Sequence, residues 1–562
     1  MRALHKLAPI ALFLALFALL VLSNRLDWDQ FFSFFEVERR AWLLDHAPPR
    51  WSYQLCAGAS RLGDPQAFGL SPLFLPILLL GTFWGAKILP LVCMVLGWRA
   101  LAHALGVLFP ALEPTLRSAL ALFFLFGNYL LWHLYAGHLA FVLIPFSFIA
   151  LSLSLRMFGA GFHWRHAALF ALVGYAQMSA GFYPSVVFFL IPVIVCLMLP
   201  ALVLRLGRMP ERASLLRYLG ALAVALAASS YKWLGVLSYQ RLFPRTLTAD
   251  RHVPERAITI FEALAYQLSP TRDFDFWVAP SAWGPWDVWE YSAFSAISIF
   301  ALALLVRSVQ RRRVVPIARA PLAYFLVSLL LYLSFTFGED SAFSLHHLLN
   351  ATLYRGSVRV IGRYAIVLQL LMLLFTGWRL AADEALRAWA ERVLVPLGYA
   401  ICALNLAMLF PLADVESTRA AMNTERTRLA EMSTERFVRP RTTERPHSNP
   451  YVVPSSYMYQ AIARGELVPN CYQPLRRPRT ITTEARAFGV EVKDDNTIEL
   501  VDPEPGPISA ACRDSVRVTQ QAIVFDGAAC PSDLCLNLNA LNLYADPPFK
   551  LDEEREKYCR TR

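Results

Sequence analysis

Long apolar stretches separated by short polar hinges occupy the first 412 residues of the chain. Leu7–Ser23 and Leu322–Phe337 are two of them, and each approaches the ~20 residues with which an α-helix crosses a bilayer. The pattern predicts about eleven transmembrane helices, the first near residues 7–23 and the others near 86–108, 117–134, 139–156, 166–182, 183–206, 215–237, 291–307, 320–337, 359–380 and 392–412. We therefore expect an all-α polytopic membrane domain over residues 1–412.

One further apolar run, Leu70–Leu80, is too short to span. Pro72 and Pro76 interrupt it, and a helix of this length covers only ~16 Å of a hydrocarbon core that is ~30 Å thick. If it is a re-entrant or surface helix, every arginine-rich hinge faces the cytoplasm, as the positive-inside rule requires. The turns Tyr135–His138 and Gly181–Ser185, which carry no Lys or Arg, then face outward.

Composition narrows the class of protein. Of 562 residues, 56% are hydrophobic and only 17% charged, and the mean hydropathy is +0.42. These values exclude a soluble multidomain, disordered or collagen-like chain. Residues 414–562 carry 20 Lys and Arg against 22 Asp and Glu, so the net charge of +11 comes from the membrane part. Arginines in short loops indicate orientation in the membrane, and we expect no nucleic-acid partner.

Three longer polar regions share the outer side in this topology: residues 25–69, residues 238–290 and the carboxy-terminal part. In the last, residues 413–450 are predicted to be a connector and residues 451–562 a small β-rich extracytoplasmic domain, because apolar and polar residues alternate in Val490–Val492, Thr497–Val501 and Val516–Val518. Five of the nine cysteines fall there, at Cys471, Cys512, Cys530, Cys535 and Cys559. Disulfides in an oxidising compartment are one explanation, and free buried thiols are the other.

Several common motifs are absent from the sequence. It contains no P-loop, GxGxxG, HExxH or paired CxxC, so ATP-driven transport and zinc-dependent hydrolysis have no basis in it. No small-x-small cleavage pattern follows Leu22, and we expect the first helix to be retained with its start in the cytoplasm.

The most informative polar region is 25–69, which follows the first predicted helix. It contains, in order, Asp27-Trp-Asp29, Glu36 with Arg39 and Arg40, Pro48-Pro-Arg-Trp51 and Gly63-Asp-Pro-Gln66. In this order, and in Gly137-His138 after a later helix, the chain resembles the GT-C class of membrane glycosyltransferases, especially its YfhO-type bacterial branch. The resemblance covers residues 1–412. It implies a GT-C-like fold in the bacterial inner membrane, with the active face outside the cytoplasm.

The resemblance also implies a chemistry. GT-C enzymes take sugars from polyprenyl-phosphate carriers and place an acidic residue just beyond the first helix, where Asp27 and Asp29 stand. Sugar transfer needs a base for the acceptor hydroxyl and stabilisation of the departing phosphate. Asp29 is the predicted base. Asp27 is a second carboxylate, an orienting group or, together with Asp29, a ligand of Mg²⁺ or Mn²⁺. Metal-independent catalysis and ordinary solvated carboxylates are the alternatives.

Basic residues supply candidates for binding the donor phosphate. Arg355, Arg359 and Arg363 lie at the start of the tenth predicted helix, and positions 359 and 363 share a helical face because they are four apart. A planar guanidinium matches two phosphate oxygens. Lys232 is a further candidate, because an ammonium in an apolar stretch requires an anion. The alternative for each is a side chain that extends from a helix end to the lipid headgroups.

Four more residues are candidates for sugar or acceptor contacts. They are His138, Glu36 and, in the region 238–290, Trp283 and Trp286, because aromatic faces beside polar groups suit sugars. The tryptophans fit a membrane-interface belt equally well. His138 and its neighbour His133 fit interfacial hydrogen bonding at least as well as ligand binding.

The expected function is therefore a multi-pass glycosyltransferase that uses a polyprenyl-phosphate-linked sugar among the membrane lipids. Its acceptor is an envelope glycan, a lipid or a protein. Two alternatives stay open: a lipid or solute transporter such as a flippase, and a non-catalytic assembly protein for envelope polysaccharide. A transporter places broken or polar helices near the bilayer midplane, often in two repeated halves. In this chain the charged candidate residues are predicted to lie together at the outer face of the membrane.

Overall fold

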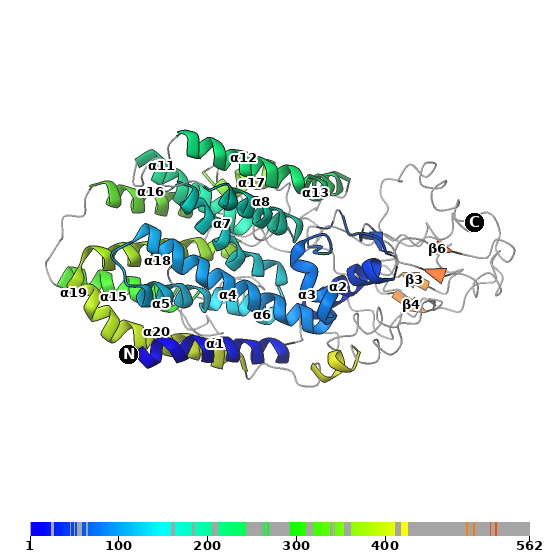
Figure 1. The fold of residues 1–562 in the computed structure, drawn as a ribbon, viewed down its shortest axis with the longest axis horizontal. Helices are drawn as coiled ribbons and strands as arrows, with labels where there is room; N and C mark the ends of the chain where they lie inside the picture. The colour runs from blue at the N-terminus through cyan, green and yellow to red at the C-terminus, as the bar shows by residue number, and fades with distance from the viewer. Residues whose placement is uncertain are drawn as a thin grey trace. The chain divides into compact units, whose positions relative to one another are not determined.

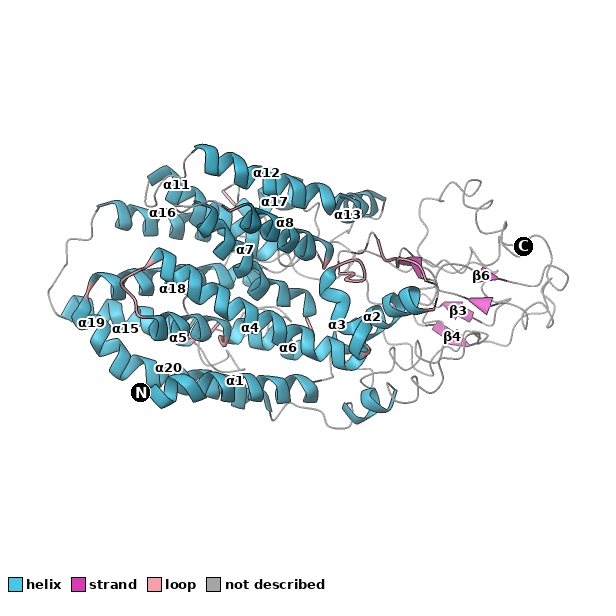
Figure 2. Ribbon diagram, in the orientation of Figure 1, coloured by secondary structure: helices cyan, strands magenta, loops and turns pink. Residues whose placement is uncertain are grey.

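The structure is a computed structural model. It describes residues 2–23, 27–44, 46–49, 51–52, 59–62, 64, 66–158, 163–181, 186–204, 212–242, 261, 264, 267–268, 293–310, 319–337, 341, 343–352, 361–410 and 418–424, and the strand residues 490–492, 498–500, 517–518 and 523–524. Helices dominate this part of the chain (Figure 2). Two compact units divide it: Met1–Ser23, Lys87–Ser230 and Thr246–Ala413 form the first, and Asn24–Ala86, Tyr231–Arg245 and Asp414–Arg562 form the second.

The first unit is a bundle of apolar helices. Its elements, with the chain-order labels of Figure 1, are α1 (Arg2–Leu22), most of α4 (Thr82–Leu108), α5 (Pro114–Leu125), α6 (Asn128–Ala136), η2 (Leu139–Val142), α7 (Leu143–Phe158), α8 (Trp164–Ser179), the run η3 (Val186–Leu190), α10 (Ile191–Val193), η4 (Ile194–Met198) and α11 (Leu199–Leu204), then α12 (Arg212–Ala228), α15 (Ala296–Gln310), α16 (Arg319–Thr336), α17 (Leu345–Thr352), η9 (Ile361–Tyr364), α18 (Ala365–Ala382), α19 (Glu384–Trp389), η10 (Ala390–Leu394) and α20 (Val395–Leu409). Within it α8 packs against α7 and α12, α15 against α18, and α20 against α1 and α5.

The length and composition of the helices are those of membrane spans. Among the described residues, four helical runs are long and apolar enough to cross a bilayer, and two bent pairs, each taken as one span, raise the number to six. The four runs are Thr82–Leu108, Leu139–Met157, Gly362–Ala382 and Glu384–Leu409. Each of the eleven apolar segments predicted from the sequence overlaps one or more of the described helices. A mostly helical fold with four to six candidate membrane helices is thus confirmed for the described residues, whereas the count of eleven spans stays a prediction.

One of the two bent pairs consists of α5 and α6. Helices α5 and α6 meet at Phe126 and Gly127 with a bend of 47°, which frees backbone carbonyls from the helical hydrogen bonding. Asn405 Nδ2 donates to the carbonyl of Phe126 at 2.9 Å, and Gln369 Nε2 approaches the carbonyl of Phe124 at 3.5 Å. Side chains from α20 and α18 thus satisfy the break inside the protein, as a broken helix in a membrane requires.

The second unit is built on α2 (Asp27–Leu43), with η1 (Pro72–Phe74), α3 (Leu75–Leu80) and most of α13 (Ser230–Leu242). Its core is aromatic, since α2 buries side chains that are at most 1% exposed, namely Trp28, Phe31, Phe32, Phe34 and Phe35. Helix α3 has only six residues and covers about 9 Å along its axis. It is too short to span, in agreement with the interpretation of Leu70–Leu80 from the sequence.

Short antiparallel strand pairs complete the second unit. Strand β1 (Trp51–Ser52) pairs with β2 (Ala59–Ser60), β3 (Val490–Val492) with β4 (Ile498–Leu500), and β5 (Arg517–Val518) with β6 (Ile523–Val524). Strands β3, β4 and β5 fall inside the three segments that alternation predicts. The rest of the predicted β-rich domain, its five cysteines included, lies outside the described residues.

Candidate functional site

The loop after the first helix is a folded structure. Helix α1 ends at Leu22, and α2 begins at Asp27, so Asp27 and Asp29 are the first and third residues of a helix. Positions two apart lie about 200° apart around a helix axis, so the two sites do not share one face. The side chains of both aspartates lie outside the described residues.

Farther along α2, Glu36 is engaged within the protein. Its Oε1 accepts a hydrogen bond from Arg40 Nε at 2.7 Å, and its Oε2 accepts one from Thr82 Oγ1 at 2.7 Å. The side chain is fully buried. Glu36, a sequence candidate for sugar contact, therefore joins α2 to the first residue of α4.

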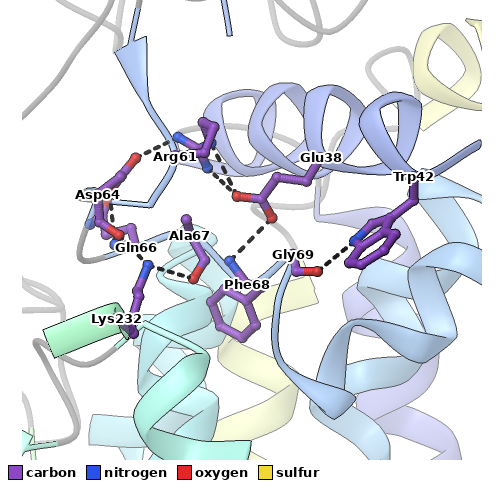
Figure 3. A network of polar contacts seen from close by, with 9 residues as sticks. All are labelled: Glu38, Trp42, Arg61, Asp64, Gln66, Ala67, Phe68, Gly69 and Lys232. Atoms are coloured by element: carbon purple, nitrogen blue, oxygen red, sulfur yellow. Dashed lines mark hydrogen bonds and ion pairs between the residues drawn. The ribbon is translucent and has the colours of Figure 1, made fainter. Parts of the chain in front are cut away.

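Two residues later, Glu38 anchors the returning loop (Figure 3). Its Oε1 accepts hydrogen bonds from Arg61 Nη2 at 2.6 Å and Nε at 3.1 Å, and its Oε2 accepts one from the backbone N–H of Phe68 at 3.1 Å. Arg61 Nη1 also donates to Asp64 Oδ2 at 2.5 Å, and its guanidinium lies over the ring of Phe34. One arginine thus joins two carboxylates in a fully buried network.

Burial and ion pairing shift the pKa values of Glu38 and Arg61 in opposite directions. Burial raises the pKa of Glu38 above its ordinary value of 4.5, although the charge and hydrogen bonds of Arg61 lower it. For Arg61, burial acts to lower the pKa, but the carboxylates of Glu38 and Asp64 outweigh it and the pKa is raised. The guanidinium therefore stays charged, and it is the partner that makes a charged Glu38 tolerable in the interior.

Lys232 closes the network from α13. Its ammonium donates to the carbonyls of Asp64 at 2.5 Å and Ala67 at 3.1 Å, and the residue is 2% exposed. Figure 3 shows it directed at the loop between these residues. Two of its three N–H donors are therefore used on the backbone, and the contacts assign Lys232 to anchoring this loop.

Gly69 ends the anchored loop. Its carbonyl accepts a hydrogen bond from Trp42 Nε1 at 2.7 Å. A Cβ at this position would stand 2.5 Å from Pro49 Cγ and 3.0 Å from Glu38 Cβ. The close approach of loop and α2 thus needs a residue without a side chain.

A different polar cluster lies in the first unit, at the end of α6. Gly137 adopts a left-handed conformation (φ 84°, ψ 14°), and the backbone N–H of His138 donates to the carbonyl of His133 at 2.9 Å. This Schellman-type ending turns the chain back on its last turn. It brings His133 Nδ1 within 2.7 Å of His138 Nδ1.

Aromatic rings surround this histidine pair and place an arginine beside it. His133 stacks on Phe141, with ring centroids 3.8 Å apart and planes 6° apart. The Arg363 guanidinium carbon lies 5.4 Å from the centroid of Phe141 and 5.3 Å from that of Phe188. The backbone carbonyl of Arg363 accepts a hydrogen bond from Tyr129 Oη at 2.7 Å. The structure thus brings two sequence candidates, His138 and Arg363, into one cluster.

Other candidates cannot be placed. Arg355, Arg359, Trp283 and Trp286 lie outside the described residues, so the shared face of positions 359 and 363 stays a prediction. Among the side chains that the structure does describe, no three His, Cys, Asp or Glu residues gather as ligands for a metal ion. The side chains of Asp27 and Asp29 lie outside the described residues, so the binding of Mg²⁺ or Mn²⁺ by this pair stays a prediction.

Sequence analysis assigned no role to the residues that organise the first loop. One feature of the sequence could have indicated Glu38, Arg61 and Asp64, because these three charged residues lie in a segment that is otherwise rich in aromatic residues. The signal for the histidine pair was Gly137, the residue type that ends a helix and returns the chain. No known family model matches this chain, and neither a curated protein nor a solved structure does.

Proposed function

We propose that this chain is an integral-membrane glycosyltransferase that moves a sugar from a polyprenyl-phosphate carrier to an envelope glycan, lipid or protein outside the cytoplasm. One observation carries the proposal. Helix α2, whose first turn contains Asp27 and Asp29, is fixed to its own loop by the buried network of Glu38, Arg61 and Asp64. A catalytic carboxylate must be held within about 0.5 Å of its working position, and a rigid helix supports this.

In the proposed reaction the acceptor oxygen attacks the anomeric carbon of the donor sugar. The bond from that carbon to the phosphate oxygen breaks, and the polyprenyl phosphate leaves with the bonding electrons. Asp29 takes the proton of the acceptor hydroxyl. Attack opposite the leaving group inverts the configuration of the sugar. Arg363 offsets the charge that develops on the phosphate, because its guanidinium carries a permanent positive charge.

The broken helix bears on the transporter alternative. A transporter uses the free carbonyls of a broken helix to coordinate an ion or a substrate. At the break between α5 and α6, Asn405 donates to the carbonyl of Phe126, and the carbonyl of Phe124 accepts from the backbone N–H of Gly127 and lies 3.5 Å from Gln369 Nε2. This arrangement supports a structural role for the break, and with it an enzyme in preference to a carrier.

The direct test is transfer by the purified protein from a radiolabelled pool of polyprenyl-linked sugars. We expect Asp29→Asn to lower kcat by about 10²–10⁴-fold, the usual contribution of a general base, and Asp27→Asn to have a smaller effect, since the two positions face different directions. Asp383→Asn is the matched control, because Asp383 caps α19 through a bond from the N–H of Leu386 that an asparagine also accepts.

Addition of a chelator and then of Mg²⁺ or Mn²⁺ distinguishes metal-dependent from metal-independent catalysis in the same assay. Full activity in all alanine and asparagine variants at positions 27 and 29 would remove the assignment of the base. No transfer by the wild-type protein from any donor in the pool would remove the proposed function itself.

A further inference from the structure

We propose that His133 and His138 form a pair that presents one proton, on Nε2 of His138, to a phosphate oxygen of the lipid-linked donor. His133 is the positioning residue and His138 the residue that contacts the ligand. The identity of the ligand rests on the proposed glycosyltransferase function, whereas the arrangement of protons follows from the geometry of the pair.

The first step is the distance between the rings. Two imidazole nitrogens 2.7 Å apart are joined by a hydrogen bond, and this requires an N–H on one nitrogen and a lone pair on the other. A proton on each of the two Nδ1 atoms would place two donors face to face. The pair therefore holds one proton between its Nδ1 atoms.

The second step is the direction of that bond. His133 is 0% exposed, and its Nε2 is buried with no hydrogen-bond partner among the residues that the structure describes. A neutral imidazole carries one N–H. A proton on this Nε2 would be a buried donor without an acceptor, which is rarer in proteins than an under-satisfied acceptor. His133 thus carries its proton on Nδ1 and donates it to His138 Nδ1, so neutral His138 has its own proton on Nε2.

The third step is the charge of the surroundings. Arg363 lies on the same aromatic platform as the pair, within 5.4 Å of the centroid of Phe141, on which His133 stacks. This permanent cation disfavours an imidazolium nearby and favours an anion. An N–H donor and a guanidinium that both lie near Phe141 suit an oxyanion with several acceptor oxygens, and a phosphate is such a group.

The arrangement of protons can be measured without any enzyme assay. In ¹⁵N-histidine-labelled protein in lipid nanodiscs, we expect His138 to show a protonated Nε2 and an unprotonated Nδ1 at neutral pH, with its signals identified by their loss in His138→Gln. In His133→Phe, which keeps a ring to stack on Phe141 but has no nitrogen, His138 should become a mixture of both tautomers. His133→Asn should restore the wild-type state, because the asparagine amide can donate from near the position of Nδ1.

Binding tests the role toward phosphate. Nanodiscs containing phosphatidylglycerol alone, or with added polyprenyl monophosphate, distinguish a general headgroup site from a carrier site. We expect polyprenyl monophosphate to shift the Nε2 signal of His138, and phosphatidylglycerol alone not to shift it. We expect His133→Phe to weaken carrier binding about twofold, because only about half of His138 then carries its proton on Nε2. His103→Phe is the matched control, because His103 is also hydrogen-bonded through both ring nitrogens, Nε2 accepting from Arg156 and Nδ1 bonding to Ser152, and its charged neighbours are Arg156, Arg117 and His166.

Three results would overturn the inference. They are an unprotonated Nε2 on His138 in the wild-type protein, an unchanged His138 tautomer in His133→Phe, and equal carrier binding by the wild-type and His133→Phe proteins. A shift produced by phosphatidylglycerol alone would replace the carrier with a headgroup and overturn the ligand assignment. Correct tautomers and carrier binding without sugar transfer would instead leave this inference standing and remove the proposed function.

Discussion

The two polar clusters hold their arginines in different ways. In the second unit, Arg61 donates to two buried carboxylates, and Lys232 donates to two backbone carbonyls. In the first unit, Arg363 lies against two phenyl rings beside a histidine pair. A guanidinium that is bonded to carboxylates has its charge compensated within the protein. A guanidinium that lies on aromatic rings gains only a weak cation–π attraction from them. The rings themselves therefore compensate little of its positive charge.

The difference indicates two roles. A buried network in which two acids meet two bases fixes the shape of a loop, although such a network adds little net stability over an apolar core. A cation on an aromatic platform is suited to an anion that arrives from outside. The contacts of the first cluster support a role in shaping the loop, and ligand binding is the role that we propose for the second.

The largest effect is expected for Arg61→Met. The substitution leaves Glu38 and Asp64 buried with the single positive charge of Lys232, and breaking a buried ion pair by removing one partner costs about 3–5 kcal/mol. The measurement is the free energy of unfolding of the purified protein in mixed micelles at pH 8. An effect below about 1 kcal/mol, the value typical of exposed ion pairs, would contradict the assignment of shape to this network.

The same variant predicts a dependence on pH. Burial already raises the pKa of Glu38. Loss of the guanidinium leaves Lys232 as the remaining positive charge that lowers this pKa, so the folded-state pKa rises further above the unfolded value. A raised carboxyl pKa gives stability that is present below the unfolded pKa, near 4.5, and is lost as pH rises through the folded value. Arg61→Met should therefore be less damaging at pH 5 than at pH 8. Glu38→Gln combined with Arg61→Met is the control, because it removes the titrating group and should abolish the difference.

The next effect concerns Arg363. Arg363→Met keeps an apolar side chain against Phe141 and Phe188 but removes the charge, and we expect the KM for the lipid-linked donor to rise about 10–100-fold, the equivalent of one or two charge-assisted hydrogen bonds. Arg363→Lys should recover part of the loss. Arg379→Met is the matched control, since Arg379 also lies over an aromatic ring, that of Trp378, but is in the last turn of α18. Equal rises in KM for both variants would show that the aromatic platform of Arg363 has no special role.

The helical elements were predictable because apolar periodicity and length are local properties of the sequence. Local signals also predicted two kinds of shorter element. The spacing of the prolines predicted the short helix at Leu75–Leu80, and the alternation of apolar and polar residues predicted strands β3 and β4. The bend between α5 and α6 was not predicted. It depends on Asn405 and Gln369 meeting carbonyls that are far away in the sequence, and no local pattern contains that information.

The site was predictable only in part for the same reason. Charged residues in the first loop were visible in the sequence, but whether a carboxylate faces solvent or another side chain depends on tertiary contacts. Glu36 was interpreted as a sugar contact, yet it is buried against Arg40 and Thr82. His138 and Arg363 were assigned separately, and only the fold brings them together around Phe141.

The smallest effect is expected for the substitution of Lys232. This substitution tests most directly whether a basic residue orders the loop or binds the donor phosphate. The sequence makes it a candidate for the donor phosphate, whereas its contacts with the carbonyls of Asp64 and Ala67 make it an anchor. Lys232→Met keeps the aliphatic part of the side chain and removes the donor, so we expect a loss of about 1.5 kcal/mol in the free energy of unfolding. At a temperature where the variant stays folded, its donor KM should be within twofold of the wild-type value. If Lys232→Met instead raised the donor KM as strongly as Arg363→Met and left the free energy of unfolding unchanged, Lys232 would belong to the phosphate site and not to the anchoring network. An ammonium that only orders the loop should lower the free energy of unfolding without raising the donor KM.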